Sequence, residues 1–248
     1  MRVRYLPNTK FILNMEKGYP KYKQVSFEPS PTSVTKFIGL YNVTYQDENG
    51  KIIPYSVVSR PTKINNTNLP DAVSVLPYYI DKDGEPIFII GNQYRFPIHS
   101  RELSCFAGLL DKSDVELGQP KNTILKSVSR ELSEECGEVK ILKTIPMTPI
   151  MNKSAGLSNE TEQTYLAEIG GIPGAQNLES SEDISCIEIK GRDLSAFLDE
   201  IENLESKQTT SSIILQSALS SVIGREKFIS FVKDSINEKN KSNPLNKD

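Results

Sequence analysis

The sequence predicts an α/β fold in which a mixed sheet carries helices packed against it. Two successive hairpin patterns occupy residues 37–90, and the first sustained helical spacing appears only at 121–137. Strand patterns and then helical patterns follow towards the C-terminal end. Strands, one helix, further strands and late helices are the order expected when helices cover the faces of one sheet.

The N-terminal part of the chain predicts a β-rich segment. Residues 1–35 are rich in Lys, Tyr, Pro and Ser without a sustained period, and the Pro-Ser-Pro run at 29–31 predicts a loop. Two β-rich runs follow, at 37–46 and 51–60, and an Asn-Gly dipeptide at 49–50 lies between them. Because Asn-Gly suits the turn of a two-stranded hairpin, these runs are expected to pair.

A second hairpin is expected directly downstream. The apolar runs 72–80 and 86–90 flank an Asp-Lys-Asp-Gly segment that is typical of a tight turn. Apolar residues then recur at every fourth position from Ile124 to Cys136, which predicts a helix over 121–137. The remaining expected elements are strands at 161–169 and 186–190 and helices at 193–204 and 211–236.

Composition excludes several classes of protein. The 248 residues are 37% hydrophobic and 25% charged, with a formal net charge of −3, a balance typical of a globular protein. No apolar stretch approaches the roughly 20 residues that a membrane span needs, and the first residues lack a signal-peptide core. We therefore expect a cytoplasmic protein without membrane association. A mildly acidic chain also disfavours nucleic acid as a partner.

The titratable residues favour carboxylate chemistry. His99 is the single histidine, which excludes a multi-histidine zinc site. The three cysteines, Cys105, Cys136 and Cys186, are far apart and form no CxxC pair, and none is expected to act as a nucleophile. Asp and Glu together number 32, so a hard metal ion held by acidic ligands is the favoured chemistry.

The most informative segment is the acidic end of the expected helix, residues 130–137. Glu131 and Glu135 lie one helical turn apart with Glu134 beside them, and the apolar stripe predicts that all three face away from the packed side. Three neighbouring carboxylates repel one another unless a cation neutralises them, and Mg²⁺ prefers such oxygen ligands. A solvated acidic helix surface is the alternative interpretation.

Four motifs in a fixed order give this segment its context. The run R-E-L-S-E-E-C-G at 130–137 resembles the core of the Nudix box, R-E-U-x-E-E-x-G, where U is apolar. Upstream, A-G-L-L-D at 107–111 and Q-Y-R-F-P at 93–97 are similar to motifs of the ADP-ribose pyrophosphatase branch of Nudix hydrolases. Downstream, S-A-G-L-S-N-E at 154–160 resembles a loop motif of the same branch. The resemblance covers about residues 55–190.

The resemblance implies a Nudix α/β/α sandwich with a mixed sheet, preceded by an N-terminal β-rich segment. Residues 1–65 would form that segment, which in this branch commonly mediates dimerisation and completes the substrate site. Residues 66–236 would form the Nudix hydrolase domain with its C-terminal helices, and 237–248 a polar tail. A homodimer is therefore expected.

The resemblance also implies Mg²⁺-dependent (or Mn²⁺-dependent) hydrolysis of the pyrophosphate bond of ADP-ribose or a related nucleoside diphosphate sugar. The products would be a nucleoside monophosphate and a sugar phosphate. Two alternatives are a pyrophosphatase for UDP-glucose-type sugar nucleotides and a Nudix-fold nucleotide-binding or sensor module that does not hydrolyse its ligand.

In this family the metal ligands come from the box, here Glu131, Glu134 and Glu135, and Arg130 orients the carboxylates. The main-chain carbonyl of Ala107 would complete the metal coordination, and a glycine at position 108 suits close approach of the backbone.

The base that activates water is expected in the loop after the box. Glu160 is the first candidate, and Glu162, Glu182 and Glu188 are the others. On the substrate side, Tyr55 would stack against the nucleobase of the substrate. Arg60 and Arg95 would bind the diphosphate or the terminal ribose. The branch commonly has Trp where this chain has Tyr55.

Three positions depart from the family pattern. An insertion between the A-G-L-L-D motif and the box leaves Asn122 where the box has a glutamate that braces Arg130. Asp114 or Glu116 could replace this brace, or Asn122 could cap the helix and leave Arg130 to bind its own acids. Ser104 also stands where the branch usually has glutamate, and Glu138 replaces the apolar residue that closes the box.

Overall fold

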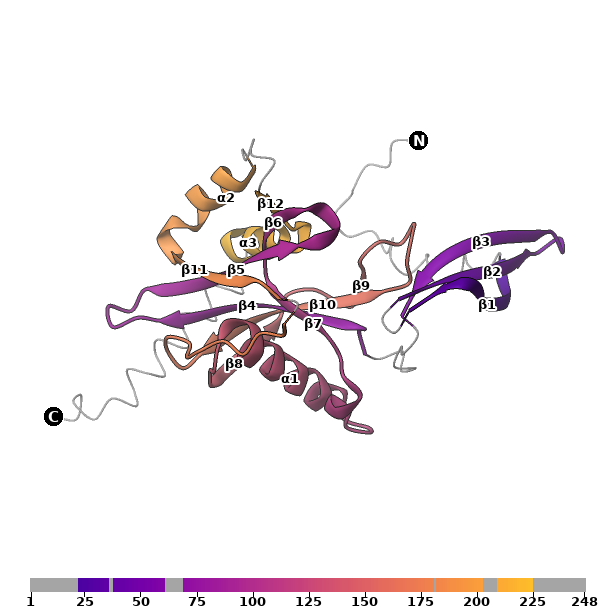
Figure 1. Cartoon of the computed structure of the whole chain (residues 1–248). Helices are drawn as coiled ribbons and strands as arrows, with labels where there is room; N and C mark the ends of the chain where they lie inside the picture. Colours follow the sequence, from indigo (N-terminus) through magenta and orange to yellow (C-terminus); the bar gives the residue numbers. More distant parts are fainter. Residues whose placement is uncertain (1–21, 36–37, 61–68, 181, 203–208, 225–248) are drawn as a thin grey trace, which may run out of the picture. The chain divides into compact units, whose positions relative to one another are not determined.

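The structure is a computed structural model that describes residues 22–35, 38–60, 69–180, 182–202 and 209–224. The chain divides into two units (Figure 1). The first contains residues 1–63 and 152–160, and the second contains residues 64–151 and 161–248. The expected tail at 237–248 and the end of the helix expected at 211–236 lie outside the described residues.

The first unit contains a three-stranded antiparallel sheet in the order β1-β2-β3. Its strands are β1 (Tyr22–Val34), β2 (Gly39–Asp47) and β3 (Ile52–Ser59). The β2–β3 hairpin confirms the Asn-Gly prediction, and Gly50 adopts the positive φ of 83° that this turn requires. The loop predicted at 29–31 is wrong, because β1 continues through it with an irregular register. Since β1 is an edge strand, proline is tolerated there.

The second unit is built on a nine-stranded mixed sheet. Its main path runs β12-β6-β5-β4-β10-β8, while β11 pairs with β5, β7 with β4 and β9 with β10. The strands are β4 (Ala72–Ile80), β5 (Pro86–Arg95), β6 (Ser100–Ser104), β7 (Phe106–Leu109), β8 (Ile141–Pro146), β9 (Met151–Asn152), β10 (Thr161–Ile169), β11 (Ile184–Lys190) and β12 (Thr209–Ser211). Parallel β4–β10 and β6–β12 pairs within an otherwise antiparallel arrangement confirm the mixed sheet.

Helices cover both faces of this sheet, as Figure 1 shows. Helix α1 (Pro120–Glu131) packs on one face, and α2 (Leu194–Glu202) and α3 (Ile213–Gly224) lie on the other. The alternation of side chains along the strands explains this arrangement: on β4, Val73 and Val75 join the core under α1, whereas Leu76 and Tyr78 join the core under α3. The second unit is therefore an α/β/α sandwich, as predicted.

The observed elements follow the predicted ones closely. The strand expected at 161–169 is β10, and the strand expected at 186–190 is the second part of β11. The helix expected at 121–137 instead divides into α1 and a π-helical turn, Leu132–Cys136. Within the described residues, no helix is long and apolar enough to span a membrane.

Candidate active site

The acidic motif lies at the end of α1 and in the π-helical turn that follows it. The amide of Gly137 donates to the carbonyl of Leu132 at 3.0 Å, which closes a turn one residue wider than an α-helical turn. Glu131 and Glu135 are only 6% and 5% exposed, whereas Glu134 is half-buried. The prediction that all three acids face away from the packed side is therefore wrong for Glu131 and Glu135.

Arg130 links the acids to one another. Its Nη1 lies 2.7 Å from Glu131 Oε1 and 3.2 Å from Glu134 Oε2. Its Nη2 lies 3.0 Å from Asp114 Oδ2 and also donates to the carbonyl of Leu109. Burial alone would lower the pKa of Arg130, but the hydrogen bond that it donates to Asp114 and the neighbouring carboxylate charges raise it. Arg130 is thus a fixed cation that orients carboxylates on both sides.

Asp114 makes the contact with Arg130 that the glutamate of the Nudix box would make. It is buried, and it ends a 3-10 turn (Lys112–Asp114) in which Asp111 accepts the amide of Ser113 and Asp114 accepts the amide of Asp111. This reciprocal capping fixes the backbone of the turn. Its carboxylate therefore meets the guanidinium of Arg130 from outside the helix.

The other replacements considered for the brace have different contacts. Glu116 pairs with Lys126 at 2.5 Å. Asn122 lies inside the first turn of α1, where its amide nitrogen donates to Glu116 Oε2 at 3.0 Å. The expectation that Asn122 caps the helix is wrong, because Gln119 and Pro120 already begin it.

The Ala107–Gly108 segment of β7 lies against these carboxylates. A Cβ on Gly108 would lie 1.9 Å from Glu131 Cδ, so only glycine leaves room for that side chain. The amide of Ala107 donates to Glu135 Oε2 at 2.8 Å. Burial raises the pKa of Glu131 to about 7 and that of Glu135 to about 8, although Arg130 and the Ala107 amide oppose the shifts. Both acids are costly to keep charged in this environment.

A segment after β10 closes over the end of the acidic turn. The amide of Asn177 donates to the carbonyl of Glu134 at 2.9 Å, and the Gln176 side chain donates to the carbonyl of Glu135. Gly137 allows this packing, since a Cβ there would lie 2.4 Å from the carbonyl of Gly174. The sequence offered no signal for Gln176 or Asn177, because their contacts are with main-chain carbonyls.

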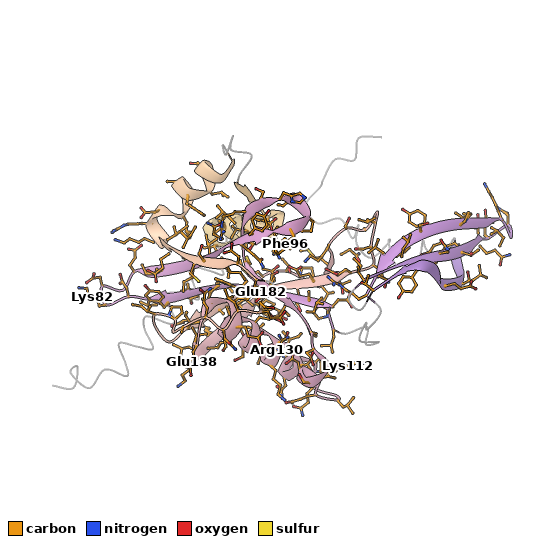
Figure 2. The ribbon with its side chains drawn as sticks, in the orientation of Figure 1. Lys82, Phe96, Lys112, Arg130, Glu138 and Glu182 are labelled. Carbon is orange, nitrogen blue, oxygen red and sulfur yellow. The ribbon has the colours of Figure 1, made fainter. Side chains whose placement is uncertain are left out.

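Glu182, labelled in Figure 2, follows in the same segment. Its charge contributes to the raised pKa of both Glu131 and Glu135. Its carboxylate accepts the amide of Glu179 at 2.8 Å, which fixes the local turn. The positive charge of Arg95 also acts on Glu135, whose pKa it lowers against the effect of burial. Arg95 Nε lies 3.0 Å from Glu102 Oε2.

The acids have the chemistry to hold a divalent cation. In the described part of the chain, no three acidic, His or Cys side chains already converge as metal ligands. Arg130 explains this, since its guanidinium lies within 3.2 Å of both Glu131 and Glu134. The donor set nevertheless fits a hard ion: it offers carboxylate oxygens, two of the acids are buried with raised pKa, and Gly108 leaves space beside them.

The other predicted site residues lie in the first unit. Arg60 Nε lies 2.6 Å from Glu160 Oε2, and Lys153 Nζ lies 3.6 Å from Glu160 Oε1. The hydroxyl of Tyr55 donates to the carbonyl of Gly156 at 3.1 Å, and Tyr55 is 49% exposed. A cavity of about 200 Å³ lies beside it, lined by Tyr45, Tyr55, Val57, Ala155, Leu157, Ser158 and Asn159. The 154–160 loop thus packs on β3.

The two remaining base candidates are held by other groups. Glu162 is buried on β10 and accepts a hydrogen bond from the Ser74 hydroxyl. Glu188 on β11 accepts from the Tyr79 hydroxyl at 3.1 Å. Both carboxylates therefore have hydrogen-bonding roles within the sheet.

Known proteins with similar sequences and folds agree with this geometry. No family model matches the chain. The ADP-ribose pyrophosphatase of Saccharomyces cerevisiae is 28% identical over 182 residues, which cover 71% of this chain and 72% of that protein. A solved ADP compounds hydrolase matches the fold with a TM-score of 0.52 at 16% identity, covering 85% of this chain and 99% of that one.

A Nudix hydrolase from Nitrosomonas europaea is also similar, with 16% identity, a TM-score of 0.39 and coverage of 62% of this chain and 90% of that one. The first of the two solved structures supports the fold. Together with the motifs at 93–97, 107–111, 130–137 and 154–160, the yeast relative makes the chain similar to Nudix hydrolases, and in particular to their ADP-ribose pyrophosphatases.

Proposed function

We propose that this protein hydrolyses the pyrophosphate bond of ADP-ribose or a related nucleoside diphosphate sugar. Water attacks one phosphorus, the bridging P–O bond breaks, and a nucleoside monophosphate and a sugar phosphate leave. The observation that carries the proposal is the pair of buried acids, Glu131 and Glu135, against the Ala107–Gly108 backbone. A protein without metal chemistry would gain little from burying two carboxylates that repel each other.

Glu131, Glu134, Glu135 and the Ala107 carbonyl would hold Mg²⁺ or Mn²⁺. When bound, such an ion offsets the charge of the pyrophosphate and lowers the pKa of a bound water. Arg130 keeps the carboxylates of Glu131 and Glu134 in place through the contacts described above. The Ala107 amide fixes one oxygen of Glu135.

We assign the proton acceptor for the attacking water to Glu182. Among the four candidates, its charge acts on both Glu131 and Glu135. Glu160, the first sequence candidate, pairs with Arg60 at 2.6 Å. A carboxylate that already accepts a hydrogen bond from a cation has fewer lone pairs available for the proton of an attacking water. Glu160 therefore serves better to hold Arg60 in position than to accept a proton.

Substrate recognition would use Tyr55, Arg60 and Arg95. Tyr55 exposes half of its surface beside the cavity of the first unit, which suits stacking on a base. Arg60 lies beside Glu160 and Arg95 beside Glu102, and guanidinium groups are well suited to bind phosphate or ribose oxygens. A homodimer and a cytoplasmic location, expected from the sequence, complete the proposal.

One assay tests the proposal. Purified protein with Mg²⁺ is incubated with ADP-ribose, UDP-glucose, diadenosine polyphosphates or dNTPs, and phosphate released by an added phosphatase is measured. Turnover of ADP-ribose that disappears in Glu135→Gln supports it. Turnover of UDP-glucose alone would move the substrate to that class. Nucleotide binding without product from any compound would favour a non-hydrolysing module and overturn the proposal.

A further inference from the structure

Two cysteines that are distant in sequence meet behind the acidic turn. Cys136 ends the π-helical turn, and Cys186 lies on β11. The Cys186 sulfur lies 3.8 Å from the carbonyl oxygen of Cys136, so the two residues are in contact. Cys136 is buried, whereas Cys186 is exposed. One thiol of the pair is thus accessible from solvent, and the other is held against it.

A cavity of about 360 Å³ opens onto both cysteines. Its walls are formed by Ile89, Cys136, Ile172, Pro173, Gly174, Ala175, Gln176, Cys186 and Glu188. A small oxidant such as a hydroperoxide can therefore reach the Cys186 sulfur. The third cysteine, Cys105, is buried in the core on the other face of the sheet, so it cannot join the pair.

We propose that Cys136 and Cys186 form a reversible disulfide when the protein meets a hydroperoxide. In the first step the Cys186 sulfur attacks the hydroperoxide, an S–O bond forms, the O–O bond breaks and an alcohol leaves. In the second step the Cys136 sulfur displaces water from the sulfenic acid, and its proton leaves with that water. Two thiols are oxidised, and one hydroperoxide is reduced to alcohol and water.

The disulfide would act on the acidic turn directly. Its sulfurs lie about 2.05 Å apart, closer than two thiols that are not bonded to each other, so the end of the turn must shift towards β11. Glu135 immediately precedes Cys136, and Gln176 contacts both the carbonyl of Glu135 and the Cys186 sulfur at 3.7 Å. Changes in such supporting contacts typically cost about 10–100-fold in metal affinity or activity. Oxidation should therefore lower the proposed hydrolase activity by about tenfold or more.

Thiol titration tests the disulfide independently of that activity. The full chain is treated with hydrogen peroxide under metal-free conditions, unfolded and titrated for free thiols before and after dithiothreitol. We expect two of the three cysteines to disappear and to return on reduction, with one cross-linked peptide that joins Cys136 to Cys186. The intact mass should fall by two hydrogen atoms.

Two variants provide the controls. Cys105→Ser should retain the loss of two thiols and the fall in activity, whereas Cys186→Ser, a change at an exposed position, should lose both responses. A peroxide-treated chain that keeps three thiols, gains oxygen at Cys186 without cross-linking, or forms only disulfides between chains would overturn the proposal. If the disulfide forms but no compound is hydrolysed with or without it, the modification site stands and the proposed function fails.

Discussion

Two groups of acids in this molecule have opposite surroundings. At the end of α1, one guanidinium, that of Arg130, contacts three carboxylates, and Glu135 is held by a main-chain amide. In the 152–160 segment a single carboxylate, that of Glu160, contacts two cations, Arg60 and Lys153. Among these contacts, the first group has more negative than positive side chains, and the second has more positive than negative ones.

This difference indicates which ligand each group suits. Burial and mutual repulsion raise the pKa of Glu131 and Glu135, so an added cation would relieve an unfavourable charge. Around Glu160, two cations contact one carboxylate, and this positive excess among the contacts suits an anionic ligand such as a diphosphate. The comparison predicts that removing an acidic charge has opposite effects on stability in the two groups.

The largest effect is expected from Glu135→Gln. It should abolish detectable hydrolysis and yet raise the melting temperature of the metal-free protein at pH 8 by about 2 °C or more, because glutamine keeps an acceptor for the Ala107 amide without a buried charge. Calorimetry and the phosphate assay measure the two changes. Glu138→Gln, an exposed change next to the same turn, is the control and should leave both unchanged.

Glu160→Gln should shift stability the other way. It loses the pairs with Arg60 and Lys153, which are partly exposed, and this should cost at most about 1 kcal/mol. The free energy of unfolding from urea titration measures the loss. If Glu160→Gln and Glu135→Gln both stabilise the metal-free chain, the charge balance assigned to the two groups is wrong.

Removing the residue that accepts the proton from the attacking water gives the next largest effect on activity. Glu182→Gln should lower kcat by about 10²–10⁴-fold if Glu182 accepts the proton from water, while its effect on KM stays small. Glu160→Gln should act mainly on KM, since Glu160 positions Arg60. Steady-state kinetics with ADP-ribose separates the two, and the reverse pattern would return the role of base to Glu160.

Gly108→Ala probes the space beside the acids. The new Cβ would lie 1.9 Å from Glu131 Cδ, so the carboxylate must move, and we expect a loss of about 10–100-fold in metal affinity. Gly156→Ala is the matched control in the other group, because nothing lies within 4 Å of its Cβ position. Metal titration followed by calorimetry measures both, and equal affinities in both variants would show that Glu131 does not hold the ion.

The sequence predicted the sheet and the helices well. The alternation of apolar and polar residues and the residues of the turns depend only on neighbours a few positions away. Thr161–Ile169 and the β2–β3 hairpin match their predictions. The burial of Glu131 and Glu135 could not be predicted from helical periodicity, since it depends on β7 packing across the chain and on a wider turn at 132–136. Contacts of Gln176 with main-chain carbonyls leave no side-chain pattern to find.

The insertion before the box illustrates the same limit. Counting along the sequence placed Asn122 at the brace position, but the longer loop allows Asp114 to reach Arg130 from 16 residues away. Asp114→Asn should therefore lower kcat/KM by about tenfold, with the fold retained. Glu116→Gln, which loses the ion pair with Lys126 but keeps an acceptor for Asn122, is the control. Equal losses in the two variants would contradict this assignment.

The smallest effect is the pH dependence of metal binding, which tests the acid-rich group without any mutation. Glu131 and Glu135 have folded-state pKa values of about 7 and about 8, above the ordinary value of 4.5. Their contribution to the stability of the metal-free chain is therefore fully present below pH 4.5 and is lost as the pH rises through 7–8.

A cation binds the deprotonated acids, so Mg²⁺ must displace protons at pH 6 but not at pH 8.5. Mg²⁺ should consequently raise the melting temperature more at pH 8.5 than at pH 6, and Glu135→Gln should remove most of this difference. An equal shift at both pH values would mean that the buried acids are not the groups that bind the ion.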